Sequence, residues 1–305
     1  MNWFLIALIN PVVHAFVNHF DKYLISKFLK NGSVGSLILF SALFAVFALP
    51  FIYIFKPDVI HSVGFSDAVI LMVNGAVLVG AIICYLYALE DDEASYVAPL
   101  FQLIPVFGFI LGYLLLGEIL TGRQVVAGLL ILLGSLFLSL ELSGNGKKIK
   151  TRLVLLMVGS SLLYAINAVV FKSVAVNAGF VDSVFWDMAG KFIFGVILFF
   201  VIRPYREQFL ALIRDNGAYV LGLNIVNEIM GLVGEFALVL AVLYAPVALV
   251  QSVGGLQPAF VLIIGILLTK FLPHFGEEKL ERKFLVQKFI GIAIISGGVY
   301  LLQLF

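Results

Sequence analysis

The chain has little charge and almost no cysteine. Asp, Glu, Lys and Arg make up 12% of its 305 residues, about half of the roughly 25% usual in soluble domains. Hydrophobic residues reach 62%, against roughly 45–50% in soluble domains. A water-exposed surface cannot be built from so few charges, so we expect most of the outer surface to face lipid. The single cysteine, Cys84, lies in an apolar run, which excludes a disulfide framework and a cysteine-based metal site.

Other signals are missing as well. A net charge of +1, with no basic arm or tail, gives no indication of nucleic-acid binding. The sequence has no His-Glu-x-x-His, no Gly-x-Ser-x-Gly and no nucleotide-binding glycine loop, so we expect no enzyme activity, no cofactor and no metal. The N-terminal run lacks a basic region and a small-residue cleavage site. It is therefore expected to be the first span rather than a removable signal peptide.

Apolar runs of about 20 residues recur along the whole chain, and each is long enough to cross a hydrocarbon core of about 30 Å. Backbone polar groups must be satisfied internally in lipid, so we expect these runs to be α-helices joined by short loops, the longest over 143–152, 203–217 and 270–283. The sequence therefore predicts an all-α membrane protein of about ten transmembrane helices. The predicted spans are 3–21, 34–55, 67–89, 95–116, 124–142, 153–173, 183–202, 218–243, 246–269 and 284–304.

The two halves of the chain resemble each other. Pro105 and Gly112 in span four recur as Pro258 and Gly265 in span nine, both at an offset of 153 residues. Near the start of each half, a lysine recurs at an offset of 150 residues, as Lys22 and Lys172. The agreement in order and spacing indicates an internal repeat.

The repeat predicts a domain organisation. We expect a first five-helix repeat over 1–142, a linker loop over 143–152 and a second five-helix repeat over 153–305. Because five is an odd number of spans, the two repeats must lie in opposite orientations. This inverted-repeat plan is typical of secondary transporters, whose site lies near the membrane midplane where the halves meet.

Basic residues indicate an orientation. Of the 19 Lys and Arg residues, 15 fall in the odd-numbered loops, counting Lys288 in the first turns of span ten with the loop before it. The positive-inside rule then places those loops in the cytoplasm and both termini outside. For a prokaryotic protein, the membrane would be the plasma (inner) membrane.

The clearest motif lies in the first half. It combines Ala-Ser-Tyr-Val-Ala-Pro-Leu at 94–100, Pro-Val-Phe-Gly at 105–108 and an apolar run closed by Gly-Glu at 112–118, followed by Gly128 and Gly134. This pattern resembles the EamA-type branch of the drug/metabolite transporter (DMT) superfamily. The second half follows it more loosely, with Leu-Thr-Lys at 268–270 in place of Gly-Glu.

The resemblance implies a ten-helix fold and transport of a small metabolite by exchange, facilitated flow or proton coupling. It does not specify the substrate. It also implies that both termini lie in the cytoplasm, because members usually place them there. The charge count gives the opposite orientation, and the sequence leaves both open.

Two carboxylates interrupt span eight. Asn224, Glu228 and Glu235 are spaced four and seven residues apart, so they share one face of a helix. A charge at the helix centre costs at least about 2.5–3.5 kcal/mol, so each carboxylate needs a reason to be there. One interpretation is that they bind a cation or carry a coupling proton, with Asn74 of span three as the symmetry counterpart of Glu228. The alternative is a protonated Glu that hydrogen-bonds a neighbouring helix.

Spans one and six each carry a polar face. In span one it consists of Asn10, His14, Asn18 and Asp21, and in span six of Ser160, Tyr164 and Asn167. One interpretation places the two faces on opposite sides of a central cavity, where His14 could change its charge near neutral pH. The alternative is a histidine that hydrogen-bonds a backbone carbonyl. Asp21 and Lys22 are expected at the membrane interface.

Span seven carries Asp187 and Lys191 one turn apart, with the acid first, the favourable order for an ion pair within a helix. We expect this pair to neutralise itself so that the helix can enter the membrane, and a role in gating or substrate binding is the alternative.

Spans four and nine each combine glutamine with proline, as Gln102 with Pro105 and Gln251 with Pro258. Proline removes a backbone hydrogen bond and bends a helix, so these positions could be hinges or part of a site. The alternative is that Pro is merely common in membrane helices.

The function predicted from these features is secondary transport of a small polar or cationic metabolite by alternating access, either proton-coupled or by exchange. The expected partners are the solute, protons and the lipid bilayer, and the chain would be a monomer or a homodimer. Two alternatives remain: a non-transporting membrane subunit that assists lipid-carrier or envelope assembly, and an intramembrane enzyme that uses His14 with Glu228.

Overall fold

The structure is a computed structural model that describes residues 2–28, 34–91, 98–139, 151–271 and 282–303. Within these ranges the ordered elements are helices, with no strand among them. The prediction of an all-α membrane protein is confirmed.

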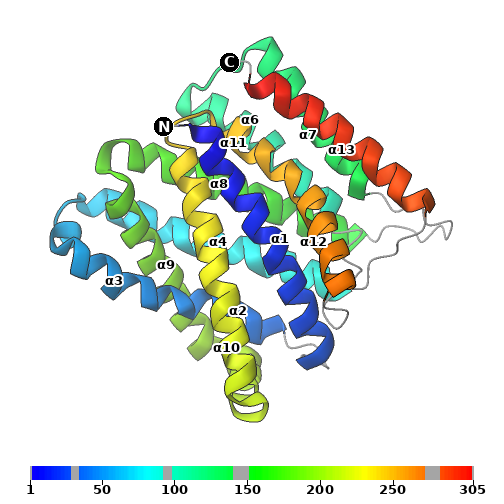
Figure 1. Cartoon of the computed structure of the whole chain (residues 1–305). Coiled ribbons are helices and arrows are strands. Elements are labelled where there is room, and N and C mark those ends of the chain that lie inside the picture. The colour runs from blue at the N-terminus through cyan, green and yellow to red at the C-terminus, as the bar shows by residue number, and fades with distance from the viewer. Residues whose placement is uncertain (1, 29–33, 92–97, 140–150, 272–281, 304–305) are drawn as a thin grey trace.

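The first part of the chain forms the blue to green helices of Figure 1. They are α1 (Trp3–Phe28), α2 (Val34–Phe44), η1 (Ala45–Phe47), α3 (Ala48–Phe55), η2 (Pro57–Ile60), α4 (Phe65–Asp91), η3 (Ala98–Gln102), α6 (Leu103–Leu116) and α7 (Gly122–Ser139).

The second part forms the green to red helices. They are α8 (Thr151–Ala178), α9 (Phe180–Val201), α10 (Arg203–Ala241), α11 (Val247–Val253), η4 (Gly254–Leu256), α12 (Gln257–Phe271) and α13 (Arg282–Gln303). The predicted linker lies at 143–152. Its residues 143–150 are outside the described ranges, and Thr151 already belongs to α8.

Seven helical segments of the described chain are long and apolar enough to cross a membrane. Three shorter apolar helices, Leu100–Leu116, Gly122–Gly134 and Phe289–Leu301, coincide with predicted spans four, five and ten. The spans predicted from hydropathy therefore correspond to the helices of the structure.

One loop prediction was wrong. Residues 203–217 form the first part of α10, which continues to Ala241 as one helix of 39 residues. Pro204 stands in the first turn, where its missing N–H costs nothing. Arg203 donates to Glu207 one turn later at 2.6 Å, which supports the helix outside the apolar run.

The prolines of spans four and nine lie at helix starts rather than in mid-helix. Pro105 is the third residue of α6, which follows the 3-10 helix η3, and Pro258 is the second residue of α12, which follows η4. A proline in a first turn breaks no hydrogen bond within its helix. Each span therefore changes from 3-10 to α geometry, and the predicted bends take this form.

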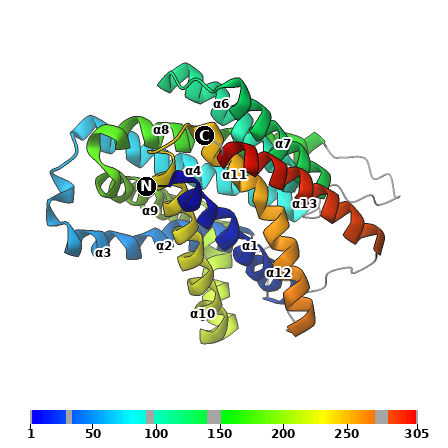
Figure 2. The same ribbon diagram turned by 45° about the horizontal axis from the view of Figure 1, so that its top comes forward.

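Helices of the first half pack mainly on helices of the second half. The contacts join α1 with α10, α4 with α8 and with α9, and α2 with α10. The helices α7 and α13 lie side by side at one edge of the bundle in both views (Figures 1 and 2). Helix α1 begins and α13 ends at the same end of the bundle, which we name the termini end (Figure 1).

Two glycines let α4 and α9 cross in backbone contact. A Cβ atom added at Gly75 would overlap the backbone of Asp187 and Lys191, and one added at Gly190 would overlap the backbone of Met72. Such small residues are what allows helices in lipid to approach closely. The crossing fixes the turn of α9 that carries Asp187 and Lys191 against α4.

Candidate substrate and ion site

An ion pair between α9 and α10 lies inside the bundle. The Nζ atom of Lys191 is 3.4 Å from Oε2 of Glu235. The lysine side chain is 1% exposed, whereas the Glu235 side chain keeps 24% exposure. The positive charge is thus enclosed by protein while its carboxylate partner stays accessible.

Asp187 is held by a different neighbour. Asn74 of α4 donates from Nδ2 to Oδ1 of Asp187 at 2.7 Å, and Asn167 of α8 donates to the backbone carbonyl of Asn74 at 3.2 Å. The sequence predicted that Asp187 would pair with Lys191. The ion pair of Lys191 is instead with Glu235. The long lysine side chain reaches the facing helix, and Asp187 already accepts a hydrogen bond from the Asn74 amide.

Glu228 lies two turns before Glu235 on α10. Its carboxylate accepts a hydrogen bond from Ser41 of α2 and lies within electrostatic range of Lys191, Glu235 and Asp21. The sequence placed Glu228 and Glu235 on one face of one helix, and the structure brings that face to Lys191. We name Asp187, Lys191, Glu228 and Glu235 the central acidic site.

The polar face of α1 packs on α10. Asn10 donates to the backbone carbonyl of Gly234 at 3.0 Å, and the His14 ring lies beside Gly234, where an added Cβ would be 2.9 Å from the ring. The imidazole is within electrostatic range of Glu235 and Lys191. His14 therefore lies at the edge of the central acidic site.

The predicted opposition of the α1 and α8 faces across a central cavity stays a prediction. On α8, Ser160 donates to the carbonyl of Ala81 and Asn167 to that of Asn74, both on α4. Backbone carbonyls of α4 thus satisfy the buried hydroxyl of Ser160 and the buried amide of Asn167.

Aromatic rings lie next to the acidic groups. Tyr164 of α8 stands edge-on to Phe101 of η3 at 6.1 Å between ring centroids, and Tyr85 of α4 lies 5.0 Å from the same ring. Tyr164 is within electrostatic range of Glu235 and Asp21. These rings offer faces that attract a cation.

Other predicted residues are separate from this cluster. Asn224 is buried and donates to Val220 of its own helix at 2.8 Å, which is a packing role. Gln251 is buried against Gly108, and Gln102 lies near Gly255, so both glutamines serve the contact between spans four and nine. Asn18 is half-buried on α1.

Asp21 was expected at the membrane interface. It accepts a hydrogen bond from Asn227 of α10 at 2.7 Å, so it also belongs to the interior contact of α1 with α10. The sequence signal was available, since Asp21 continues the polar face of Asn10 and His14. Lys22 follows it, but its side chain is outside the described part.

Glu118 and Lys172 form a contact that was not predicted from the sequence as part of a site. Their charged groups lie 2.6 Å apart and join α8 to the end of α6. A signal existed, because Glu118 closes the Gly-Glu motif and Lys172 interrupts an apolar helix. Within the described ranges, no group of three or more His, Cys, Asp or Glu side chains is arranged to hold a metal ion.

The comparisons with known proteins agree with this architecture. A family model described as the EamA-like transporter family matches residues 1–140. A solved crystal structure covers 100% of this chain and 96% of its own, with a TM-score of 0.63 and 16% sequence identity, a likeness that shows the fold alone. A search of curated proteins found no match. The family match confirms, over residues 1–140, the resemblance to the EamA-type branch of the drug/metabolite transporter superfamily that the motifs predicted.

Proposed function

We propose that this protein is a secondary transporter that exchanges small organic cations for protons by alternating access. Glu228 and Glu235 bind the cation or the proton, and Tyr164 contributes an aromatic face. Asp187, Lys191, His14 and Asn74 set the charge and geometry around them.

The observation that carries this proposal is the charge balance of the central acidic site. Three carboxylates, from Asp187, Glu228 and Glu235, lie within electrostatic range of one lysine, and Glu235 contacts it at 3.4 Å. Lys191 is 1% exposed and cannot be reached by an anionic group of a solute, whereas Glu235 is 24% exposed. A solute that enters the site therefore meets carboxylate rather than ammonium, which favours a positive charge.

Exchange follows from the cost of buried charge. An ionised carboxylate in the middle of a membrane protein needs a cation or a proton, because leaving it unpaired costs at least about 2.5–3.5 kcal/mol. A bound organic cation and a bound proton satisfy the same need and therefore exclude each other. Release of protons on one side and of the cation on the other couples their movements in opposite directions.

The packing of the helices supports two related halves, over 1–142 and 153–305. Span one packs on span eight as span six packs on span three, in the pairs α1 with α10 and α8 with α4. Span three packs on span seven as span eight packs on span two, in the pairs α4 with α9 and α10 with α2. Paired contacts of this kind are expected when inverted repeats rock against each other around a central site.

The test is transport in proteoliposomes loaded at acidic pH. Tetramethylammonium, putrescine and guanidinium serve as cationic probes, with lactate and glucose as controls of other charge, and an enclosed pH-sensitive dye reports proton exit. We expect uptake of at least one cation with matching proton exit, and loss of both in Glu228→Gln. Glu207→Gln, which removes an exposed carboxylate on the same helix, should behave like the native chain. Uptake that Glu228→Gln leaves unchanged would contradict the proposal.

A further inference from the structure

A second buried ion pair joins three helices at the termini end. Oε1 of Glu118 lies 2.6 Å from Nζ of Lys172, and Oε2 accepts the backbone N–H of Val247 at 2.8 Å. The same ammonium donates to the carbonyl of Ala245 at 2.7 Å. The Glu118 and Lys172 side chains are 12% and 14% exposed. We name these contacts the Glu118 clamp.

The local sequence directs Glu118 inward. Gly117 ends α6 in the left-handed region, with φ of 66°, which a residue with a Cβ adopts only at a cost. The chain then folds back, and the N–H of Glu118 donates to the carbonyl of Gly112 at 3.1 Å. A Cβ at Gly112 would lie 2.7 Å from Oε2 of Glu118, so this glycine makes room for the carboxylate.

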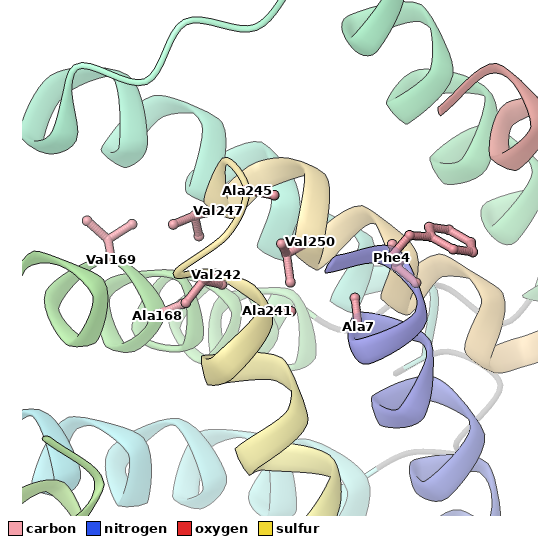
Figure 3. Packing of buried hydrophobic residues seen from close by; sticks show 10 residues of the cluster. Phe4, Ala7, Ala168, Val169, Ala241, Val242, Ala245, Val247 and Val250 are labelled. Atoms are coloured by element: carbon pink, nitrogen blue, oxygen red, sulfur yellow. The ribbon is translucent and has the colours of Figure 1, made fainter. Parts of the chain in front are cut away.

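A cluster of buried hydrophobic residues adjoins the clamp. Figure 3 shows its side chains approaching one another from α1, α8, α10 and α11 and from the turn between α10 and α11. Two of its members, Ala245 and Val247, supply the backbone groups that the clamp binds. The buried residues are Phe4, Ala7, Ala168, Val169, Ala241, Val242, Ala245, Val247, Val250 and Val253.

The position of this cluster closes one end of the bundle. It lies where α1 begins and α10 ends, beside Ala168 and Val169 of α8, between the central acidic site and the termini end. A hydrated passage to that end would have to separate these side chains. The clamp ties the turn at Ala245 and Val247 to α6 and α8 and therefore opposes this separation.

The internal repeat does not reproduce the clamp in sequence. At the offset of 153 residues that relates Pro105 to Pro258, the counterpart of Glu118 is Phe271, an exposed apolar residue. A lysine remains at the counterpart of Lys172, which is Lys22, but the carboxylate is missing. The Glu118 clamp is therefore a feature of one half of the sequence that the other half does not repeat at the corresponding positions.

We propose that the Glu118 clamp is the lock of the termini end and biases the protein towards the state in which that end is closed. The inference rests on the proposed function, since alternating access is what requires this end to open. Opening would break the contacts of Glu118 with Lys172 and Val247 together, because all of them depend on one carboxylate.

The test measures access to the hydrophobic cluster from the termini end. Cys84→Ala removes the single native cysteine, and Ala168→Cys, at a position 2% exposed, introduces a reporter within the cluster. A membrane-impermeant maleimide is applied to sealed vesicles from each side, and a tag on the C-terminus identifies which side carries the termini. We expect slow labelling with the clamp intact. Glu118→Gln and Lys172→Met should each accelerate labelling from the termini end by about tenfold or more, a factor that corresponds to about 1.4 kcal/mol.

Control variants distinguish the loss of the Glu118 clamp from a general loosening of the fold. Lys172→Arg keeps the charge and should stay within about twofold of the native rate, and Glu207→Gln breaks an exposed ion pair and should change nothing. Size-exclusion chromatography in detergent identifies variants that do not fold. If both clamp variants fail to fold, the milder Glu118→Asp shortens the reach by one methylene, and unchanged labelling would contradict the lock.

The readout does not depend on transport. Labelling that accelerates in a protein that moves no cation would support the lock while contradicting the proposed cation exchange. Unchanged labelling in a folded clamp variant that still transports would overturn the lock and leave the proposed function intact.

Discussion

Lys191 lies 3.4 Å from Glu235 of the facing helix, although Asp187 stands one turn away on its own helix. An ion pair between helices fixes the distance and register of α9 and α10, which a pair within one helix cannot do. Membrane-embedded charges of this kind mark functional sites by default. A single substitution of Lys191 or Glu235 therefore changes the net charge of the central acidic site.

The Lys191 pair should show strong coupling between its two residues. Glu235→Gln alone should lower stability by about 3–5 kcal/mol, because it removes the ion-pair partner of Lys191, whose side chain is 1% exposed. Lys191→Met alone should cost less, because the Glu235 carboxylate that it leaves is 24% exposed. The double variant Lys191→Met/Glu235→Gln should recover most of that loss. Thermal unfolding in detergent measures all three, and single and double losses that simply add would show that the two side chains do not interact.

The crossing of α4 and α9 should not tolerate a methyl group. Gly190→Ala and Gly75→Ala should each cost about 1–3 kcal/mol, because the added Cβ meets backbone atoms that cannot move aside. Gly80→Ala on α4 is the matched control, since its Cβ would meet only the flexible end of Leu163 at 3.5 Å. Equal stability of Gly80→Ala and Gly75→Ala would argue against the crossing.

Substitution of Asp182 should lower the stability of the fold more than substitution of its partner Lys56. Its side chain is 5% exposed and accepts from Lys56 and from Ser62, the latter at 2.5 Å, which ties the connection before α4 to the start of α9. Asp182→Ala removes both bonds and should cost about 1–3 kcal/mol. Lys56 is 42% exposed, so Lys56→Met should cost less than about 1 kcal/mol. Urea or thermal unfolding distinguishes the two, and the opposite ranking would contradict this account.

Transport should depend on pH in a defined direction. Protons compete with the cation for Glu228 and Glu235, so acidifying the side from which the cation enters should raise its apparent KM by about three- to tenfold. Alkaline pH on the same side should lower it. Initial uptake rates at a series of external pH values give the profile. Glu228→Gln should flatten it and Glu207→Gln should not, whereas an unaltered profile in Glu228→Gln would exclude this carboxylate as the shared site.

Much of the fold could be predicted from sequence for a physical reason. Lipid excludes unpaired backbone groups, so each long apolar run must be a helix, and hydropathy locates it. Hydropathy does not locate the start of α10, because residues 203–217 are helical although they were predicted to be a loop. Charged residues end the membrane span, but they do not end the helix when Pro204 starts it and Arg203 bonds Glu207.

The site could be predicted only in part. Helical spacing placed Glu228 and Glu235 on one face because spacing along one helix is a local property. The partner of Lys191 was predicted wrongly, because a local rule favoured Asp187 while the choice depends on which helix packs against α9. The roles of Glu118 and Lys172 stayed hidden for the same reason, as they are 54 residues apart in the chain.

The sequence by itself thus determined a helical membrane protein with carboxylates inside its spans and a first half that matches the EamA-like family, because composition, run length and motif spacing are properties of contiguous residues. Only the tertiary structure decided which charges meet. The pairing of Lys191 with Glu235, the contact of α4 with α9 at Gly75 and Gly190, and the clamp of Glu118 on Lys172 and Val247 all depend on helices brought together by packing. These partners are neighbours in space, and the separation of two residues along the chain does not tell whether they are neighbours in space.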